Sequence, residues 1–360
     1  MVKDFDHFSD SYYQKDNKEQ KRNRKALEKK DRSKFKKSDQ KSKESLEKFD
    51  NLPIGRVISV ESEGAIVFDE KTQEYFICAV KGSLKYEESK EKNLLTIGDF
   101  VLFEKLPSNQ GHIVQVKARH STLYRADNFS RRKMQLIAAN IDQVLVTVSC
   151  VQPGLKTALI DRYIIAALRG NMKPVILITK VDLIKEHPDI LEMIEDVIET
   201  YRDLGYATIG ISTVTHHGLD ELKEHMKGKA SVFSGQSGVG KTSLINSITG
   251  KNFKTQEIIE KTMKGSHTTT KAHLVPLECG GFCIDTPGIR SFGMWDLKKE
   301  EIQHYFPEIE EKRKSCKYGN CTHQNEPDCA VRKAVEKGKI APFRYESYIS
   351  LMSEDTPLDY

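Results

Sequence analysis

The chain has 360 residues, of which 38% are hydrophobic and 30% charged, and its formal net charge is +5. This length exceeds the usual size of one hydrophobic core, so we expect two or three domains. No apolar run approaches the roughly 20 residues that cross a bilayer, and the N-terminus MVKDFDHFSD lacks the apolar core of a signal peptide. These properties argue against a membrane or secreted protein and predict a cytoplasmic one.

The excess of positive charge lies in the first 50 residues. They hold 16 Lys and Arg against 11 Asp and Glu, an excess equal to that of the whole chain. Segment 1–50 also lacks periodic apolar residues, so it cannot bury enough surface to offset the entropy of ordering. We expect a basic arm, disordered or partly helical, that either contacts RNA phosphates or only keeps the chain in solution.

Short β-rich runs follow in segment 51–118. Five strands are expected, over Arg56–Val60, Ala65–Phe68, Tyr75–Val80, Asp99–Leu106 and His112–Lys117. Five short strands in such a segment are typical of a small barrel like the OB-fold, which often binds oligonucleotides. A purely structural barrel is the alternative, because fold alone does not establish function.

Strands and helices alternate across segment 119–300, after a connector that carries Arg119 and Arg125. The expected strands are Ile141–Ser149, Val175–Ile178, Ala207–Ile211, Ala230–Ser234 and Gly281–Ile284. The expected helices are Lys156–Arg169, Asp189–Arg202, Leu219–Met226 and one that begins near Lys241. Such alternation predicts a mainly parallel α/β sheet with helices on both faces and ligands at the carboxyl ends of the strands.

The stretch GQSGVGKTS fits the phosphate-binding loop (P-loop) pattern G-x-x-x-x-G-K-[ST] between an expected strand and an expected helix. Glycines let successive backbone N–H groups point at phosphate oxygens, and the helix presents its positive dipole end. Lys241 is expected to reach the β- and γ-phosphates, and Thr242 to bind Mg²⁺. The candidate residues are Gly235, Gln236, Ser237, Gly238, Val239, Gly240, Lys241, Thr242 and Ser243.

Two motifs before the P-loop point to guanine. TKVD, made of Thr179, Lys180, Val181 and Asp182, resembles the guanine-reading box [NT]-K-x-D. The Asp182 carboxylate can accept both N1–H and the exocyclic amine of guanine, a pattern that adenine does not offer, so it would select GTP over ATP. GIST follows the next strand, and Ser212 and Thr213 would contact the guanine carbonyl through their backbone.

Two motifs after the P-loop point to the γ-phosphate. GSHTTT has the composition of a mobile switch in which Thr269, or else Thr268, would bind Mg²⁺. DTPG matches D-x-x-G, in which Asp285 would support Mg²⁺ and the Gly288 N–H would meet the γ-phosphate. Together the boxes predict a GTPase, and Asp182 argues against the alternative of a P-loop kinase or ATPase.

The order of the boxes differs from that of an ordinary GTPase, in which the P-loop comes first and the guanine box near the end. Here TKVD and GIST precede GQSGVGKTS. The sequence therefore predicts a circularly permuted GTPase domain, a rearrangement that can keep the site while moving the chain termini.

A group of soft ligands lies in the C-terminal segment 301–360. The odd number of cysteines, seven, argues against a disulfide framework. Three thiolates and one imidazole form the donor set of a closed tetrahedral Zn²⁺ site, from Cys316, Cys321, His323 and Cys329. Redox-active or merely buried thiols are the alternative. The aromatic and basic residues of Pro342–Glu354 either pack on this module or touch RNA.

The barrel, the permuted boxes and the C-x4-C-x-H-x5-C module together resemble the bacterial ribosome small-subunit-dependent GTPase A family, RsgA, over about Leu52–Ser353. The resemblance implies an OB-like barrel, a permuted P-loop domain and a zinc-binding α-helical module. It also implies a late assembly factor that binds the small ribosomal subunit and its rRNA and leaves after ribosome-stimulated hydrolysis of GTP to GDP. We expect a monomer. A GTP-regulated RNA or protein binding module, with incidental hydrolysis, is the alternative.

Two positions bear on how this family pattern works here. Thr179 replaces the more frequent Asn of the guanine box and loses its amide donor, so guanine affinity is expected to fall while Asp182 keeps the specificity. Ile289 follows DTPG, where Ras-like enzymes carry the Gln that orients the attacking water. We hypothesise that His267 positions this water once ribosome contact orders the switch. Candidate catalytic residues are therefore His267 and Lys241.

Overall fold

The computed structural model describes residues 52–61, 64–81, 94–127, 130–249, 273–285 and 297–353. The predicted basic arm, the switch residues His267 and Thr269, and Gly288 lie outside these ranges. From Ile54 onward the described residues belong to one compact unit.

A closed barrel of five strands comes first, in the order β1-β2-β3-β5-β4. Its strands are β1 (Ile54–Val60), β2 (Ala65–Asp69), β3 (Glu74–Val80), β4 (Phe100–Leu106) and β5 (Gln110–Val116). β1 pairs with β4 to close the barrel, and only the β3–β5 pairing is parallel. Alternate residues such as Val101 and Phe103 fill the interior, because side chains alternate across a strand. The predicted OB-like barrel is confirmed.

A two-stranded antiparallel hairpin follows the barrel, made of β6 (Thr122–Asp127) and β7 (Ser130–Ala139). The sequence predicts only a connector here, because the charged run RRK interrupts any apolar alternation in β7. Packing holds the hairpin instead, since Leu123 and Ala138 are fully buried in the core of the next domain. Tertiary contacts therefore override a weak local strand signal.

A six-stranded sheet forms the centre of the next domain, in the order β10-β9-β8-β11-β13-β12. Its strands are β8 (Gln143–Ser149), β9 (Lys173–Thr179), β10 (Ala207–Ile211), β11 (Ala230–Ser234), β12 (His273–Pro276) and β13 (Phe282–Asp285). All neighbouring pairs are parallel except β12 with β13. The chain thus builds β8, β9 and β10 before it enters the middle of the sheet at β11.

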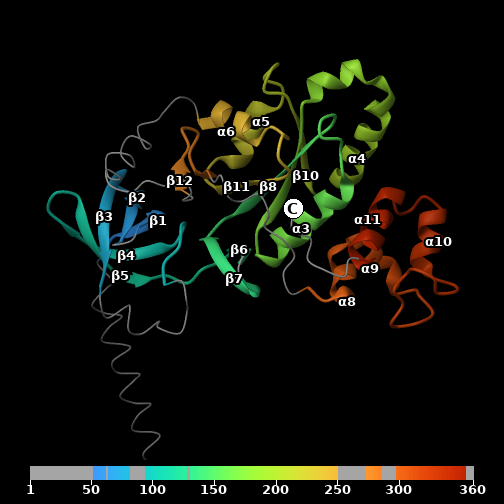
Figure 1. Ribbon diagram of the computed structural model, residues 1–360, viewed down its shortest axis with the longest axis horizontal. Helices are drawn as coiled ribbons and strands as arrows, with labels where there is room; N and C mark the ends of the chain where they lie inside the picture. Colours follow the sequence, from blue (N-terminus) through green and yellow to red (C-terminus); the bar gives the residue numbers. More distant parts are fainter. Residues whose placement is uncertain are drawn as a thin grey trace, which may run out of the picture. The chain divides into compact units, whose positions relative to one another are not determined.

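Helices cover both faces of this sheet, as Figure 1 shows. The helices are α3 (Thr157–Arg169), α4 (Leu191–Asp203), α5 (Leu219–Met226) and α6 (Lys241–Thr249), with the 3₁₀ turns η1 (Val181–Glu186) and η2 (Pro188–Ile190) before α4. α3 and α4 share one apolar cluster with the sheet, and α5 and α6 share another on the opposite face. Val144 and Val146 of β8 belong to the first cluster and Leu145 to the second, as the period of two in a strand requires.

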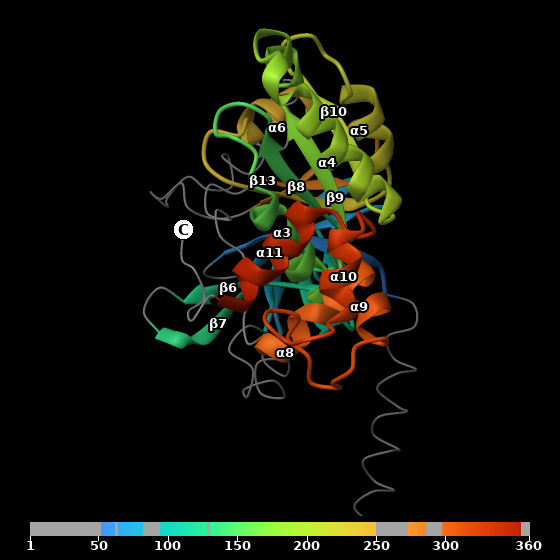
Figure 2. The same ribbon diagram turned by 90° about the vertical axis from the view of Figure 1, so that its right-hand side faces the viewer.

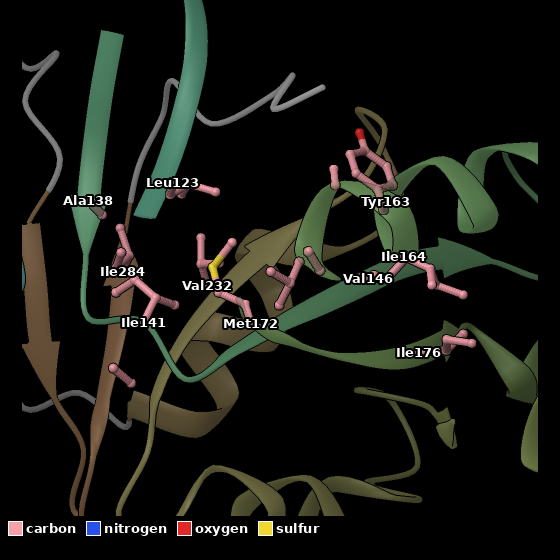
Figure 3. Packing of buried hydrophobic residues seen from close by; sticks show 14 of the residues in the cluster. Leu123, Ala138, Ile141, Val146, Tyr163, Ile164, Met172, Ile176, Val232 and Ile284 are labelled. Carbon is pink, nitrogen blue, oxygen red and sulfur yellow. The ribbon is translucent and has the colours of Figure 1, made fainter. Parts of the chain in front are cut away.

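The first of these clusters ties the hairpin to the sheet. Figure 3 shows Leu123 and Ala138 of the hairpin near Ile141 and Ile284, with α3 packing farther along the same cluster. The hairpin therefore belongs to the core of the sheet domain and not to its surface.

Buried polar contacts join the barrel to the sheet domain around Asn140, which is fully buried. The Asn140 carbonyl accepts a hydrogen bond from the guanidinium of Arg56 in β1. Its side-chain amide donates to the Gly98 carbonyl (3.1 Å), and its side-chain oxygen accepts from the His120 N–H (2.9 Å). Asn140 has φ +55°, a left-handed conformation that Asn tolerates better than most residues. One residue thus contacts three chain segments, two of them through its side chain.

A helical module ends the described chain, and Figure 2 shows it beside α3. Its elements are α8 (Lys299–Ile302), η3 (Gln303–Tyr305), α9 (Pro307–Arg313), α10 (Ala330–Glu336) and α11 (Pro342–Ser353). Ile165 of α3 is part of the apolar cluster of the module. None of the described helices is long and apolar enough to cross a membrane.

Four buried or nearly buried side chains connect this module to the sheet domain, and we call them the module joint: Arg344 of α11, Glu308 of α9, Asp161 of α3 and Tyr201 of α4. The Arg344 guanidinium donates to both carboxylates, and the Tyr201 hydroxyl donates to Asp161 Oδ1 (2.6 Å). The joint therefore links two helices of the module to two helices of the sheet domain.

We predict that Asn140→Ala lowers stability more than Asn140→Gly. Both changes leave the buried Gly98 carbonyl without its Asn140 partner, at about 1–3 kcal/mol, and remove the less buried bond from the His120 N–H. Alanine adds about 1–2 kcal/mol because it resists the left-handed conformation. Urea unfolding of the two variants checks this order, and equal stabilities would show that backbone strain at this position is unimportant.

Candidate functional site

The strand-end motifs gather along one edge of the parallel sheet. The P-loop follows β11, TKVD begins at the end of β9, and Ser212 follows β10. In a parallel sheet the carboxyl ends of all strands lie on the same edge, where α/β folds bind their ligands. Only β8 separates the strand of the guanine box from that of the P-loop. The chain therefore brings candidate base-reading and phosphate-binding segments to neighbouring positions.

The backbone of the P-loop requires its glycines. Gly235, Gly238 and Gly240 have φ values of +146°, +83° and +94°, which side chains disfavour. A Cβ atom at Gly235 would also lie 2.0 Å from the Thr147 carbonyl oxygen of β8. This contact excludes any side chain at Gly235, so the loop can lie directly against the neighbouring strand.

Lys241 begins α6 and folds back over the loop. Its ammonium group donates hydrogen bonds to the Gly235 carbonyl (2.6 Å) and to the Gln236 carbonyl. The charge is thus held above the loop that would receive phosphate. The other predicted loop residues are the buried Val239 and the exposed Ser237, Thr242 and Ser243.

Thr179 fastens the guanine box to the P-loop. Its side chain is 4% exposed, and its hydroxyl donates to the Val239 carbonyl at 2.6 Å, with the Val148 carbonyl at 3.1 Å. A hydroxyl has one hydrogen, so the shorter contact identifies its main acceptor. The bond joins residues that are 60 positions apart. Thr179 therefore acts on the backbone of the P-loop, a role that the four-letter motif does not reveal.

The rest of the guanine box presents its polar groups at the end of β9. Lys180 has φ +61°, which is uncommon for a lysine, and it directs the chain into η1. Val181 and Asp182 are half-buried in the first turn of η1. Burial raises the pKa of the Cys150 thiol, and the negative charge of the nearby Asp182 adds to this effect. The Cys150 thiol donates to the Lys180 carbonyl (3.0 Å), so the guanine box lies beside the residue that follows β8.

A loop that the sequence reading missed lies between these two boxes. Residues 150–156 connect β8 to α3, and the Gln152 carbonyl accepts a hydrogen bond from the Lys180 ammonium. A Cβ atom at Gly238 would lie 3.9 Å from Pro153 Cδ, in van der Waals contact. The loop therefore bonds to the guanine box and lies close to the P-loop. The sequence VQPGLK carries no recognised motif, so only the fold reveals this position.

The second base-reading motif forms a self-contained turn. Ser212 is fully buried, and its hydroxyl oxygen accepts hydrogen bonds from the N–H groups of Val214 (3.2 Å) and Thr215 (3.1 Å). Its own N–H donates to the His217 carbonyl (3.1 Å). Thr213 is half-buried at the start of this turn. The Ser212 side chain thus shapes the loop after β10.

The predicted γ-phosphate side of the site is only partly described. Asp285 is the last residue of β13 and pairs with His273 of β12. β13 lies next to β11, so Asp285 is one strand away from the P-loop. Gly288, His267 and Thr269 lie outside the described residues.

The C-terminal module brings its three cysteines and one histidine together. The ligand atoms of Cys316, Cys321, His323 and Cys329 all lie within 4.8 Å of one another. Cys316 Sγ is 3.9 Å from Cys329 Sγ, and His323 Nδ1 is 3.6 Å and 3.4 Å from these two sulfurs. Ligands at the usual Zn–S and Zn–N distances of a tetrahedron are separated by about 3.5–3.8 Å. The cluster therefore fits a tetrahedral metal ion in size and in donor chemistry.

Two residues outside the motif, Gln303 and Tyr345, hold His323 in place, and Glu326 holds the backbone around it. Gln303 Oε1 lies 3.3 Å from His323 Nε2, which leaves Nδ1 to face the thiols, and the Tyr345 hydroxyl donates to the His323 carbonyl (2.6 Å). Burial opposes ionisation of Glu326, but hydrogen bonds from Thr322 and neighbouring backbone N–H groups lower its pKa to about 2. Such partners orient metal ligands. Tyr345 belongs to α11, so this helix packs on the cysteine–histidine cluster.

The fold and the strand-end motifs define the class of the protein as a P-loop GTPase with a circularly permuted chain. The family model "RsgA GTPase" matches residues 116–295. The relative "Small ribosomal subunit biogenesis GTPase RsgA" of Bacteroides fragilis is 39% identical over 278 residues, which are 77% of this chain and 89% of the relative. The protein of that name from Bacillus subtilis is 34% identical over 304 residues, 84% and 97% of the two chains.

Solved structures agree with this family. The crystal structure of YjeQ from Thermotoga maritima aligns with a TM-score of 0.67 and 33% identity over 83% of this chain and 97% of its own. YloQ, described as a circularly permuted GTPase, aligns with a TM-score of 0.66 and 32% identity over 85% and 95%. The chain belongs to the RsgA GTPase family and is a GTP hydrolase. The predicted family and the predicted circular permutation are both confirmed.

We predict that Thr179→Val weakens the binding of GDP and GTP about three- to tenfold, because the P-loop loses a buried hydrogen bond at Val239. Preference for guanine over adenine should be unchanged, since Asp182 is intact. Titration with a fluorescent guanine nucleotide measures the effect. Thr208→Val is the matched control, because Thr208 is also buried and bonds a backbone carbonyl in the neighbouring strand β10. Equal affinities of the two variants would contradict this role of Thr179.

Proposed function

We propose that this protein binds the small ribosomal subunit and hydrolyses GTP during late maturation of that subunit. The observation that carries the proposal is the convergence of P-loop and guanine box on one sheet edge, with Thr179 bonded to Val239. Relatives that share most of the chain are named small ribosomal subunit biogenesis GTPases, which supports the choice of partner. A barrel of the OB type suits contact with rRNA. Because small subunits mature in the bacterial cytoplasm, the proposal implies a cytoplasmic protein, and we expect a monomer.

The nucleotide would be bound from two sides. Backbone N–H groups of the P-loop and the Lys241 ammonium would hold the phosphates, and Asp182 would select guanine by accepting two hydrogen bonds from its edge. Mg²⁺ bound with GTP would neutralise charge on the β- and γ-phosphates, and the residues that would hold it are Thr242, Thr269 and Asp285. The Gly288 N–H would meet the γ-phosphate. Thr179 and Ser212 would contribute by shaping the backbone around the base.

Hydrolysis would depend on a contact that the partner supplies. Ile289 stands after DTPG and its apolar side chain cannot orient water. We propose that His267 takes this role when the small subunit orders the switch, so turnover by the free protein is slow and the subunit stimulates it. The family assignment is compatible with this division between binding and chemistry.

A structural zinc ion would hold the C-terminal module together. Cys316, Cys321, His323 and Cys329 would bind it, and three of the four are buried. Their geometry fits a closed tetrahedral site, which has no position for a substrate. The ion would thus contribute to folding and not to the hydrolysis of GTP.

We predict that purified small ribosomal subunits raise the rate of GTP hydrolysis by at least about a hundredfold, the scale on which completing a phosphoryl-transfer site acts. Phosphate release is measured with and without subunits, and with ATP in place of GTP. His267→Ala should keep GDP affinity and lose most of the stimulation. Stimulation of His267→Ala at the wild-type level would remove the role of His267. No stimulation of the wild type would favour a GTP-regulated binding module, and preference for ATP would contradict a guanine site.

We predict that the purified protein holds one zinc ion per chain and that Cys321→Ser loses it. Structural zinc sites contribute on the order of 10 kcal/mol, so the variant module should unfold at a much lower temperature. Elemental analysis and calorimetry measure both effects. Cys279→Ser is the control, because Cys279 is only half-buried and lies outside the cluster. Wild-type protein without zinc would refute the assignment.

A further inference from the structure

The innermost contact of the module joint is an ion pair between Arg344 and Asp161, each only 1% exposed. The Arg344 guanidinium also donates to Glu308 Oε1 at 2.6 Å and to Glu308 Oε2 at 3.2 Å. Burial alone would lower the pKa of Arg344, but the charges of Asp161 and Glu308 raise it, so the guanidinium stays charged. Its ring neighbours are Phe306 of the module (4.4 Å) and Tyr201 of α4 (5.3 Å).

Such a pair constrains position more than it adds net stability. Desolvation offsets most of the attraction in a buried ion pair, while loss of one partner leaves the other charge buried and uncompensated. The planar guanidinium fits its two carboxylates in only one arrangement. Asp161, and with it α3, therefore has a fixed place relative to Glu308 and Arg344.

α3 begins directly after the loop that touches the candidate nucleotide site. Asp161 lies about one turn from the start of α3, and the hydroxyl of Thr157, its first residue, is 3.3 Å from the Ser347 hydroxyl of α11. In the preceding residues 150–156 the Gln152 carbonyl accepts a hydrogen bond from the Lys180 ammonium, and Pro153 is the nearest neighbour that a Cβ atom at Gly238 would meet, at 3.9 Å. A shift of α3 would therefore move a hydrogen bond to the guanine box and a segment that lies close to the P-loop.

A second contact from the joint reaches the same region. The Tyr201 hydroxyl donates to Asp161 (2.6 Å), and Tyr201 belongs to α4, which follows the guanine box through η1 and η2. Phe343, the neighbour of Arg344, packs on the Tyr201 ring with centroids 6.0 Å apart. The segments before α3 and before α4 are thus both connected to one pair of charges.

We propose that Arg344 is a positioning residue for the guanine nucleotide: by its ion pair with Asp161 it holds α3, and thereby loop 150–156, where Lys180 and the P-loop can bind nucleotide. The proposal rests on the proposed function of these two boxes as the GTP site. It means that the C-terminal module sets nucleotide affinity without touching the nucleotide. The coupling is thermodynamic, so the nucleotide must affect the module in return.

The test is Arg344→Met in the full-length, zinc-loaded protein, which keeps the length of the side chain and removes its charge. Titration with fluorescent GDP gives both the Kd and the number of binding sites per chain in the sample. The proposal predicts a Kd raised about tenfold, with one site per chain and zinc retained. A merely structural role predicts fewer competent chains with the wild-type Kd. Wild-type Kd in folded, zinc-loaded Arg344→Met therefore overturns the proposal.

Arg313→Met is the matched control. Arg313 pairs with Glu310 of its own helix in the same module at 2.7 Å. Its loss should leave the GDP affinity unchanged. A Kd raised equally in Arg313→Met and Arg344→Met would show that any lost arginine weakens the site, and would also overturn the proposal.

A measurement on the wild type covers the case in which Arg344→Met does not fold. Addition of GDP should slow amide hydrogen exchange in α11 as well as in loop 150–156, because coupling is reciprocal. Protection of the loop without protection of α11 contradicts the proposal. GDP binding needs no ribosome. If small subunits do not stimulate GTP hydrolysis, this result would count against the proposed function but not against the role of Arg344. A chain that binds no guanine nucleotide would contradict both.

Discussion

The parallel alignment of β10, β9, β8, β11 and β13 is the constraint on which the candidate nucleotide site depends. Parallel strands place all their carboxyl ends on one edge, whatever the order in which the chain visits them. Gly235 can lie against the Thr147 carbonyl because no Cβ atom intervenes, and Thr179 can reach Val239 across β8. The site is thus a property of strand neighbours and survives the permutation of the chain.

Directional polar contacts attach the two flanking parts to this sheet domain. Asn140 joins the barrel through two hydrogen bonds, with Arg56 and Gly98, and the Arg344–Asp161 pair joins the helical module. Both are buried, where a polar group is costly unless its partners are in place. Apolar packing alone would allow sliding at these contacts. The polar contacts define one arrangement of the barrel and the helical module on the sheet domain. This matters because the sheet domain lies between these two parts in the sequence.

The sequence predicts the motifs of the candidate sites better than it predicts the long-range contacts that join the parts of the fold. Motifs with local spacing are recognisable in the sequence, such as the P-loop with Gly235 and Lys241 and the candidate metal ligands between Cys316 and Cys329. The barrel and the β-α alternation are predicted by the periodicity of apolar residues. The hairpin β6–β7 was not predictable in this way, because Leu123 and Ala138 gain their burial from distant residues. The same holds for the Arg344–Asp161 pair, which spans 183 positions. Sequence left open whether the C-terminal aromatic residues pack or bind RNA, and Tyr345 resolves part of this by its bond to the His323 carbonyl.

β11 lies in the middle of the sheet but follows β8, β9 and β10 in the chain. The parts of the candidate site therefore form in a fixed order during synthesis. β8, β9 and β10 leave the translating ribosome first and can pair as a local unit that carries Asp182. β11 arrives later, and its contact between Gln143 and Ser231 closes over 88 residues. Until then the fully buried strand β8 has one unpaired edge, a surface prone to wrong pairing. The nascent protein thus builds the strand that carries the predicted base-reading motif before the strand that carries the predicted phosphate-binding motif.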